Sequence, residues 1–261
     1  MTIASPCPQV LVGERDQYLT LSFCRPERKN ALSLAMYSAA AEVLLAADEA
    51  PGVRAILLTG SEDSFTSGND LVDFMNDPEI HEQHPVVRFM RALQHCRKPV
   101  VAAVWGSAVG IGTTMLLHCD LVYAAEDARL QLPFVNLGLC PEYAASYLLP
   151  KLLGHVKASE LLLLGESFTG AQAATLGIVN QAVPADKLDV LVAARLQRLV
   201  RQPPAAVRRC KALLKAAQQS SVDAAIAAEF VGFAEGLGSG ECKEAVMAFF
   251  EKRVPDFSHF E

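Results

Sequence analysis

Residues Pro99 to His118 read PVVAAVWGSAVGIGTTMLLH, and this stretch decides how the chain folds. It contains no Asp, Glu, Lys or Arg, and its length approaches that of a membrane-spanning helix. Its glycines and Pro99 interrupt a continuous helix, however, and a β-branched run precedes the first glycine. The pattern therefore predicts a buried strand at Val100–Val104, a glycine turn at Gly106–Gly112 and a short helix that ends at His118.

Strand-like and helix-like segments alternate on both sides of this stretch. Alternating apolar residues predict further strands or extended pieces at Gln9–Val12, Tyr18–Phe23, Arg54–Thr59, Leu121–Ala125 and Leu130–Pro133. Helical spacing predicts helices at Leu34–Ala50, with Ser33 as its N-cap, at Val86–His95, and over most of the chain after Ala144. This order predicts an α/β fold with a C-terminal helical portion that starts near Gly177–Pro184.

The composition is that of a folded globular protein rather than a disordered chain. Of the 261 residues, 51% are hydrophobic and 20% are charged, and 23 basic against 29 acidic residues give a net charge of −6. This acidic balance, without a long basic run, argues against a nucleic-acid partner.

Cysteine usage and the two ends of the chain bear on location. The seven cysteines are scattered and form no C-x-x-C pair, which is typical of a reduced protein without a zinc site. The sequence shows neither a secretory signal pattern nor a peroxisomal C-terminal address. We therefore expect a cytoplasmic protein that does not associate with a membrane.

Two glycine-centred turns each follow a predicted strand, at Ser67–Asp70 and at Gly106–Gly112. Glycine allows close backbone approach, and the second turn leads into a helix N-terminus, where N–H groups favour a developing anion. The two turns could form an oxyanion hole, or each could be a tight strand-to-helix connection. A dinucleotide site is not supported, because the second turn lacks G-x-G-x-x-G spacing and no P-loop motif occurs.

Glu142 is the candidate for proton chemistry. It follows Pro141, and Pro at the first helical position with Glu next is also a favourable helix start, so a purely structural role is possible. The neighbouring Cys140 has no local His to activate it and is predicted to be an inert thiol. The six histidines show no metal-ligand spacing.

Several segments, taken in order, resemble the crotonase (enoyl-CoA hydratase/isomerase) superfamily over nearly the whole chain. They are Arg25–Leu32, Phe65–Leu71, Lys98–Val104, Gly106–Gly112, Cys119–Ala124 and Gly165–Val179. The resemblance implies an α/β fold, with a crotonase (ClpP-like) ββα spiral core over residues 1–195 and a C-terminal helical trimerisation region over 196–261. It also implies a homotrimer or a dimer of trimers that acts on an acyl-CoA thioester.

Two positions separate the branches of this family. Hydratases use a pair of glutamates, and the residues that stand at those places here are Thr114 and Phe134, neither of which can replace a carboxylate. The chain is more similar to the peroxisomal-type Δ3,Δ2-enoyl-CoA isomerases, which carry Ser-Gly-Asn-Asp-Leu in the first turn and one catalytic glutamate after a proline. Residues Ser67–Leu71 and Glu142 match both features.

The resemblance assigns roles residue by residue. Glu142 would be the catalytic base, and the backbone N–H groups of Asn69 and Ile111 would hold the thioester oxygen. The substrate would also meet Ser67, Gly68, Asp70, Leu71, Arg28 and Gly110, and Lys252 or Arg253 of a neighbouring subunit could meet the CoA phosphates. The resemblance implies no metal and no cofactor beyond the CoA of the substrate itself.

Other functions remain open at this point. A crotonase-type hydratase or thioester hydrolase would activate water, and a non-catalytic acyl-CoA-binding protein could use the same fold. The sequence does not give the acyl chain length. Residues that could line an acyl pocket, or serve only as core, are Phe74, Met75, Val86, Phe89 and Met90.

Overall fold

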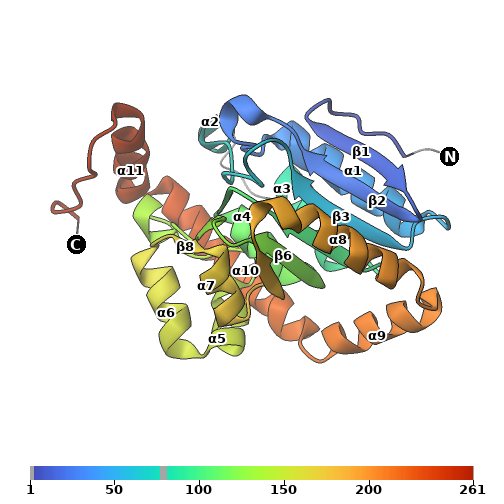
Figure 1. Ribbon diagram of the computed structural model, residues 1–261. Helices are drawn as coiled ribbons and strands as arrows, with labels where there is room; N and C mark the ends of the chain where they lie inside the picture. Colours follow the sequence, from blue (N-terminus) through green and yellow to red (C-terminus); the bar gives the residue numbers. More distant parts are fainter. Residues whose placement is uncertain (1–2, 77–80, 261) are drawn as a thin grey trace.

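The computed structural model describes residues 3–76 and 81–260 of the chain, and it shows two sheets surrounded by helices (Figure 1). The larger sheet has six strands in the order β1-β2-β3-β4-β6-β9. Its strands are β1 (Val10–Arg15), β2 (Tyr18–Phe23), β3 (Ala55–Gly60), β4 (Val100–Val104), β6 (Leu121–Ala125) and β9 (Gln181–Val183). The smaller sheet has the order β5-β7-β8, built from β5 (Ser107–Val109), β7 (Arg129–Gln131) and β8 (Phe168–Thr169).

Helices lie on both faces of the larger sheet. In Figure 1, α8 crosses one face while α1 and α3 lie behind the other. The helices are α1 (Leu34–Glu49), α2 (Leu71–Asn76), α3 (Pro85–Gln94), α4 (Ile111–Thr114), α5 (Ala145–Leu153), α6 (His155–Leu164), α7 (Gly170–Leu176), α8 (Ala185–Val200), α9 (Pro204–Ala216), α10 (Gln219–Gly238) and α11 (Gly240–Glu251). Short 3-10 turns are η1 (Pro26–Arg28), η2 (Met115–His118) and η3 (Val135–Leu137).

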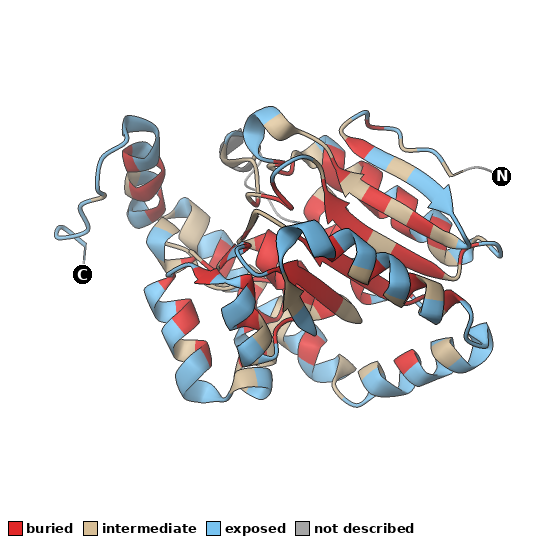
Figure 2. Ribbon diagram, in the orientation of Figure 1, coloured by how far each residue is buried: buried red, intermediate tan, exposed pale blue. Residues whose placement is uncertain are grey.

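The strands that carry the site are parallel and almost entirely buried. β3 pairs with β4 in parallel register, with Ile56 opposite Val100, and every residue of β4 is buried. In Figure 2 the strands in the middle of the sheet are largely red, the colour of buried residues. Because parallel strands end at the same edge, the loops that follow β3 and β4 meet there.

Most of the expected elements are present, and the differences have local causes. β1 extends through Gly13 to Arg15, where a loop was expected, because this mostly exposed edge strand needs no alternating apolar pattern. Its hairpin closes at Asp16 and Gln17, which both have positive φ. Ser33 caps α1 as expected, accepting a hydrogen bond from Met36 N at 3.3 Å.

Two further expectations need correction. The glycine turn contains a short strand, β5, and Glu142 does not begin a helix, because α5 starts only at Ala145. The helical C-terminal portion begins after β9, as expected, and α8 runs across the predicted boundary between residues 195 and 196. Among the described helices, none combines the length and apolarity that a membrane crossing requires.

Candidate active site

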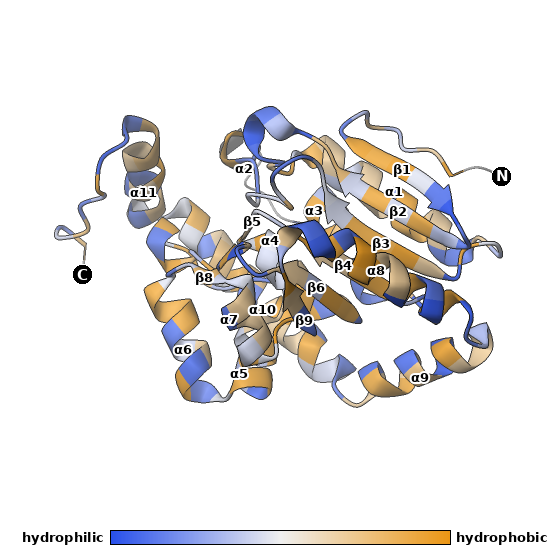
Figure 3. Ribbon diagram, in the orientation of Figure 1, coloured by the Kyte–Doolittle hydropathy of each residue, from blue (hydrophilic) through white to orange (hydrophobic). Residues whose placement is uncertain are grey.

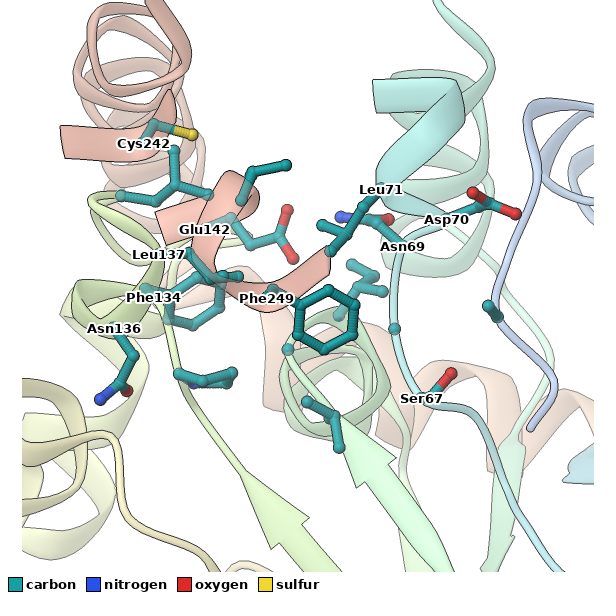
Figure 4. Close-up of a pocket in the computed structure, with 18 of the residues that line it drawn as sticks. Ser67, Asn69, Asp70, Leu71, Phe134, Asn136, Leu137, Glu142, Cys242 and Phe249 are labelled. Carbon is teal, nitrogen blue, oxygen red and sulfur yellow. The ribbon is translucent and has the colours of Figure 1, made fainter. Parts of the chain in front are cut away.

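A cavity of about 510 Å³ opens where the loops after β3 and β4 meet the C-terminal helices. The residues of the two glycine turns, Arg28 and Glu142 that were predicted to bind substrate or to act in catalysis lie on its wall: Arg28, Ser67, Gly68, Asn69, Asp70, Leu71, Gly110, Ile111 and Glu142. Their roles remain predictions, but the chain brings them together from four separate segments. Figure 4 shows the Glu142 carboxyl pointing across the cavity toward the turn that carries Asn69 and Leu71.

Backbone hydrogen bonds hold the two glycine turns against each other. Thr66 N donates to Ser107 O at 2.9 Å, and Val109 N donates back to Thr66 O at 3.1 Å. A side chain at Gly68, where φ is +96°, would place its Cβ 2.8 Å from Val109 O. Gly68 therefore permits both this backbone conformation and the close approach of the two turns.

The first turn is also held by hydrogen bonds and an ion pair with residues of an earlier segment, Arg25 and Leu32. Leu32 N donates to Gly68 O at 2.8 Å, and Asp70 N donates to Leu32 O at 3.0 Å. The Asp70 carboxylate pairs with Arg25 at 2.6 Å and accepts from Val72 N at 3.0 Å. Burial alone would raise the pKa of Asp70, but these partners lower it, so this carboxylate is ionised and engaged.

Two residues of the cavity wall have backbone N–H groups that donate no hydrogen bond in the described part of the chain. Among the described residues, neither Asn69 N nor Ile111 N donates a hydrogen bond. Gly110, with φ of +56°, turns the chain into α4 so that Ile111 is its first residue. The Asn69 side chain is held by Tyr37, whose hydroxyl donates to Asn69 Oδ1.

Glu142 is a buried carboxyl that faces the cavity. It is 4% exposed, and its Oε1 has no hydrogen-bond partner within the described chain. Burial, and then the negative charge of Glu229, raises the pKa of Glu142 to about 8. A carboxyl in this environment exchanges protons near neutral pH, which suits a general base that must also return a proton.

The positions of the two hydratase glutamates hold no acid. Thr114 is fully buried, lies off the cavity wall, and leaves its Oγ1 without a partner in the described part of the chain. Phe134 stands on the wall and offers only its ring. Among the described residues, the carboxyls that line the cavity are thus Glu142 and Asp70, and Asp70 is paired with Arg25.

The apolar end of the cavity differs from the expected acyl pocket. Val86, Phe89 and Met90 lie in the core, where Phe89 packs against Phe23 and Tyr37, and none of the three lines the cavity. The side chains of Phe74 and Met75 lie outside the described residues. The apolar wall instead consists of Phe134, Leu137, Leu139, Phe233, Leu237, Val246, Phe249 and Phe250.

Some residues of the site gave no local signal in the sequence. Tyr37 lies in an alanine-rich helix and Glu229 in the C-terminal tail, and only the fold brings either of them to the site. The α10 and α11 wall could have been found from the helical spacing of Phe233 with Leu237 and of Val246 with Phe250. Arg253, expected near CoA in a neighbouring subunit, pairs with Glu244 and Glu251 in its own chain.

Comparison with known proteins identifies one family, whose similar members include both isomerases and hydratases. The enoyl-CoA hydratase/isomerase family model matches residues 15–259. Human enoyl-CoA delta isomerase 2 is 32% identical over 251 residues, a match that covers 94% of this chain but only 64% of that longer protein. The Escherichia coli K12 2,3-dehydroadipyl-CoA hydratase is 30% identical over 252 residues, covering 95% of this chain and 98% of the relative.

A solved structure extends the likeness to three dimensions. The Pseudomonas aeruginosa protein OdaA is 48% identical, and the superposition covers 93% of this chain and 99% of OdaA with a TM-score of 0.89. The same arrangement of sheets and helices is therefore present in both chains.

Proposed function

The chain belongs to the enoyl-CoA hydratase/isomerase family and has the crotonase fold, and from this premise we propose that it is a Δ3,Δ2-enoyl-CoA isomerase. One observation carries the proposal. Among the described residues that line the cavity, Glu142 is the carboxyl without a hydrogen-bond partner; it points toward the turn that carries Asn69, and Ile111 lines the same cavity. This arrangement suits proton transfer along an acyl chain without added water.

The proposed reaction moves one proton and one double bond. Glu142 removes a proton from C2 of a 3-enoyl-CoA, and the electron pair of that C–H bond passes into a dienolate whose charge rests on the thioester oxygen. Asn69 N–H and Ile111 N–H donate to this oxygen, as two preorganised donors would in an oxyanion hole. The protonated Glu142 then delivers its proton to C4, giving the 2-trans-enoyl-CoA and restoring the base.

A hydratase activity is less well supported, because hydration needs a second group that activates the water molecule. Adding water across a double bond requires one group to activate water and another to protonate carbon, and Thr114 and Phe134 supply neither. Asp70 could not replace them readily, since Arg25 and Val72 N already use its oxygens. The wall of Phe134, Leu137 and Phe249 also favours an apolar acyl group over water next to Glu142.

Separate incubations with two substrates test this function. A 3-enoyl-CoA should be converted rapidly to 2-trans-enoyl-CoA, and a 2-enoyl-CoA should yield little 3-hydroxyacyl-CoA. Hydration as fast as isomerisation would instead assign the chain to the hydratases. Release of free CoA as the main reaction would indicate a thioester hydrolase, and binding without turnover would indicate an acyl-CoA-binding protein.

A further inference from the structure

The segment that presents Glu142 has an unusual backbone. Tyr143 and Ala144, the two residues after Glu142, have φ values of 60° and 58°. Neither is a glycine, and the left-handed conformation costs about 1–2 kcal/mol for each such residue. Because Glu142 Oε1 makes no hydrogen bond within the described residues, this turn rather than the carboxyl itself sets the direction of the side chain.

Tyr143 is anchored on three sides. Its hydroxyl donates to Met90 O at 2.6 Å, and its ring stacks on His118 with centroids 3.6 Å apart. Burial lowers the pKa of His118 to about 3, so the neutral ring donates from Nε2 to Tyr143 O at 2.7 Å. These contacts account for Tyr143 but leave Ala144 and the first turn of α5 to be held by something else.

Glu229 of α10 supplies that hold. Its Oε2 accepts from Ala144 N at 2.5 Å and its Oε1 accepts from Ser146 N at 2.8 Å. Ala144, the N-cap of α5, provides no side-chain cap, so a carboxylate from another helix takes over this function. A negative charge at a helix N-terminus is also favoured by the helix dipole.

We propose that Glu229 is the positioning residue of the base: it holds the Tyr143–Ala144 turn and so keeps the Glu142 carboxyl directed into the cavity. Glu229 is 6% exposed and does not line the cavity, so it acts through Glu142 and not on the substrate. This inference rests on the proposed function only in naming Glu142 as the base.

Glu229 also acts on Glu142 through its charge. Among the described residues, it is the charged group that raises the pKa of Glu142, after burial itself. The other titratable groups near the pair are Tyr37 of α1, Cys140 and Tyr143 of the same segment, and His118 of η2 behind Tyr143. Glu235 of α10 is exposed and acts on Cys140 rather than on the pair. No cation is among these groups, so within the described residues the repulsion is not neutralised by a basic side chain.

The test replaces Glu229 with Gln, which keeps the size of the side chain but removes the charge and gives only one good acceptor for the two N–H groups. The pKa of Glu142 is followed by 13C NMR in protein labelled at the Glu carboxyl, using the signal that disappears in Glu142→Gln. We expect this pKa to fall in Glu229→Gln, by on the order of half a unit or more. The plateau kcat at high pH should also fall, by about 10–100-fold, because the base is less well placed.

Glu235→Gln is the matched control, since it removes the same charge from an exposed position on the same helix. It should leave both the Glu142 pKa and the plateau kcat unchanged. A folded Glu229→Gln variant with the wild-type Glu142 pKa and wild-type kcat would overturn the proposal. Equal shifts of the Glu142 pKa in Glu229→Gln and Glu235→Gln would also overturn it.

A second variant covers the case in which Glu229→Gln does not fold. Adding Ala144→Gly gives the turn a residue that adopts φ of 58° without penalty, so the double variant should fold and still show the lowered Glu142 pKa. An unshifted pKa in the double variant would refute the role of Glu229. The NMR titration needs no turnover, so a chain without isomerase activity would reject the proposed function while still testing this coupling.

Discussion

At the scale of single residues, the main feature of the site is the buried carboxyl of Glu142, whose pKa is set by its surroundings. Glu142 is buried, points across the cavity toward the turn that carries Asn69, and has no hydrogen-bond partner for Oε1 in the described chain. Burial and Glu229 together raise its pKa to about 8. The pH dependence of the reaction should report this value.

Because the base must be ionised, kcat/KM should increase with pH as Glu142 loses its proton. Well below pH 8 the rate constant should rise about tenfold per pH unit, and above pH 8 it should level off. Steady-state measurements between about pH 6 and pH 9.5 would show the curve. An acidic limb near the ordinary pKa of a glutamate would contradict a raised pKa for the base.

The hydroxyl of Tyr37 should matter although it does not line the cavity. It holds the Asn69 side chain, and its ring packs 5.4 Å from that of Phe89, so Tyr37→Phe keeps the packing and removes only the hydrogen bond. A lost hydrogen bond of about 0.5–1.5 kcal/mol predicts a fall in kcat of about 2–10-fold. Tyr123→Phe, on β6, should leave kcat unchanged, and equal losses in both variants would argue against the role of Tyr37.

At the scale of elements, the site depends on two turns and one strained segment that regular secondary structure brings together. β3 and β4 run in parallel, and Thr66 bridges to β5, so the two glycine turns lie side by side. Helix α4 then begins at Ile111, which lines the cavity and whose N–H donates no hydrogen bond within the described residues.

Replacing Ile111 with Pro should remove one oxyanion donor while retaining the helix. The first position of a helix tolerates proline because its N–H has no partner within the helix. The loss of one such donor typically lowers kcat by about 10²–10³-fold. Circular dichroism would confirm the fold, and a folded variant with near-normal kcat would remove Ile111 N–H from the mechanism.

The strained backbone conformation of the turn after Glu142 should affect the free energy of unfolding. Ala144 and Ala145 are both fully buried, but only Ala144 has positive φ. Ala144→Gly and Ala145→Gly lose the same methyl group, yet glycine relieves strain only at the first position. The free energies of unfolding, measured in urea, should therefore differ by about 1–2 kcal/mol in favour of Ala144→Gly. Equal values would show that the turn stores no strain.

The outcome for each element shows what a sequence can predict. The strands β3 and β4 and the helix α1 follow from local patterns, and the residues that line the site follow from motifs in the two turns and around Glu142. The course of the chain at Tyr143 and Ala144 could not be predicted, because Glu229 stabilises it from 85 residues away. For Val86, Phe89 and Met90 the sequence left two possibilities open, an acyl pocket or the core, because helical spacing is the same in both; the structure places all three in the core.

At the scale of the whole molecule, apolar surface is left exposed where the C-terminal helices end. Val231, Met247, Phe249 and Phe250 of α10 and α11 are each more than half exposed. Figure 3 shows further apolar bands on α6 and α9, away from the sheet. An isolated soluble chain rarely leaves so many large apolar side chains in water.

This surface supports the prediction that the chain assembles as a trimer or as a dimer of trimers. Phe249 and Phe250 also line the cavity, so assembly would complete the acyl pocket as well as bury α11. Light scattering at micromolar concentration should give a mass of three or six subunits. A stable monomer or a plain dimer would contradict this prediction.

The central claim, that Glu142 is the base, is tested most directly by kcat of Glu142→Gln on a 3-enoyl-CoA. The amide keeps the size of the side chain but cannot accept the C2 proton, so the variant should fold, bind acyl-CoA and lose at least about 10²–10⁴-fold in kcat. If the folded variant kept more than roughly a tenth of the wild-type kcat, another residue would have to be the base.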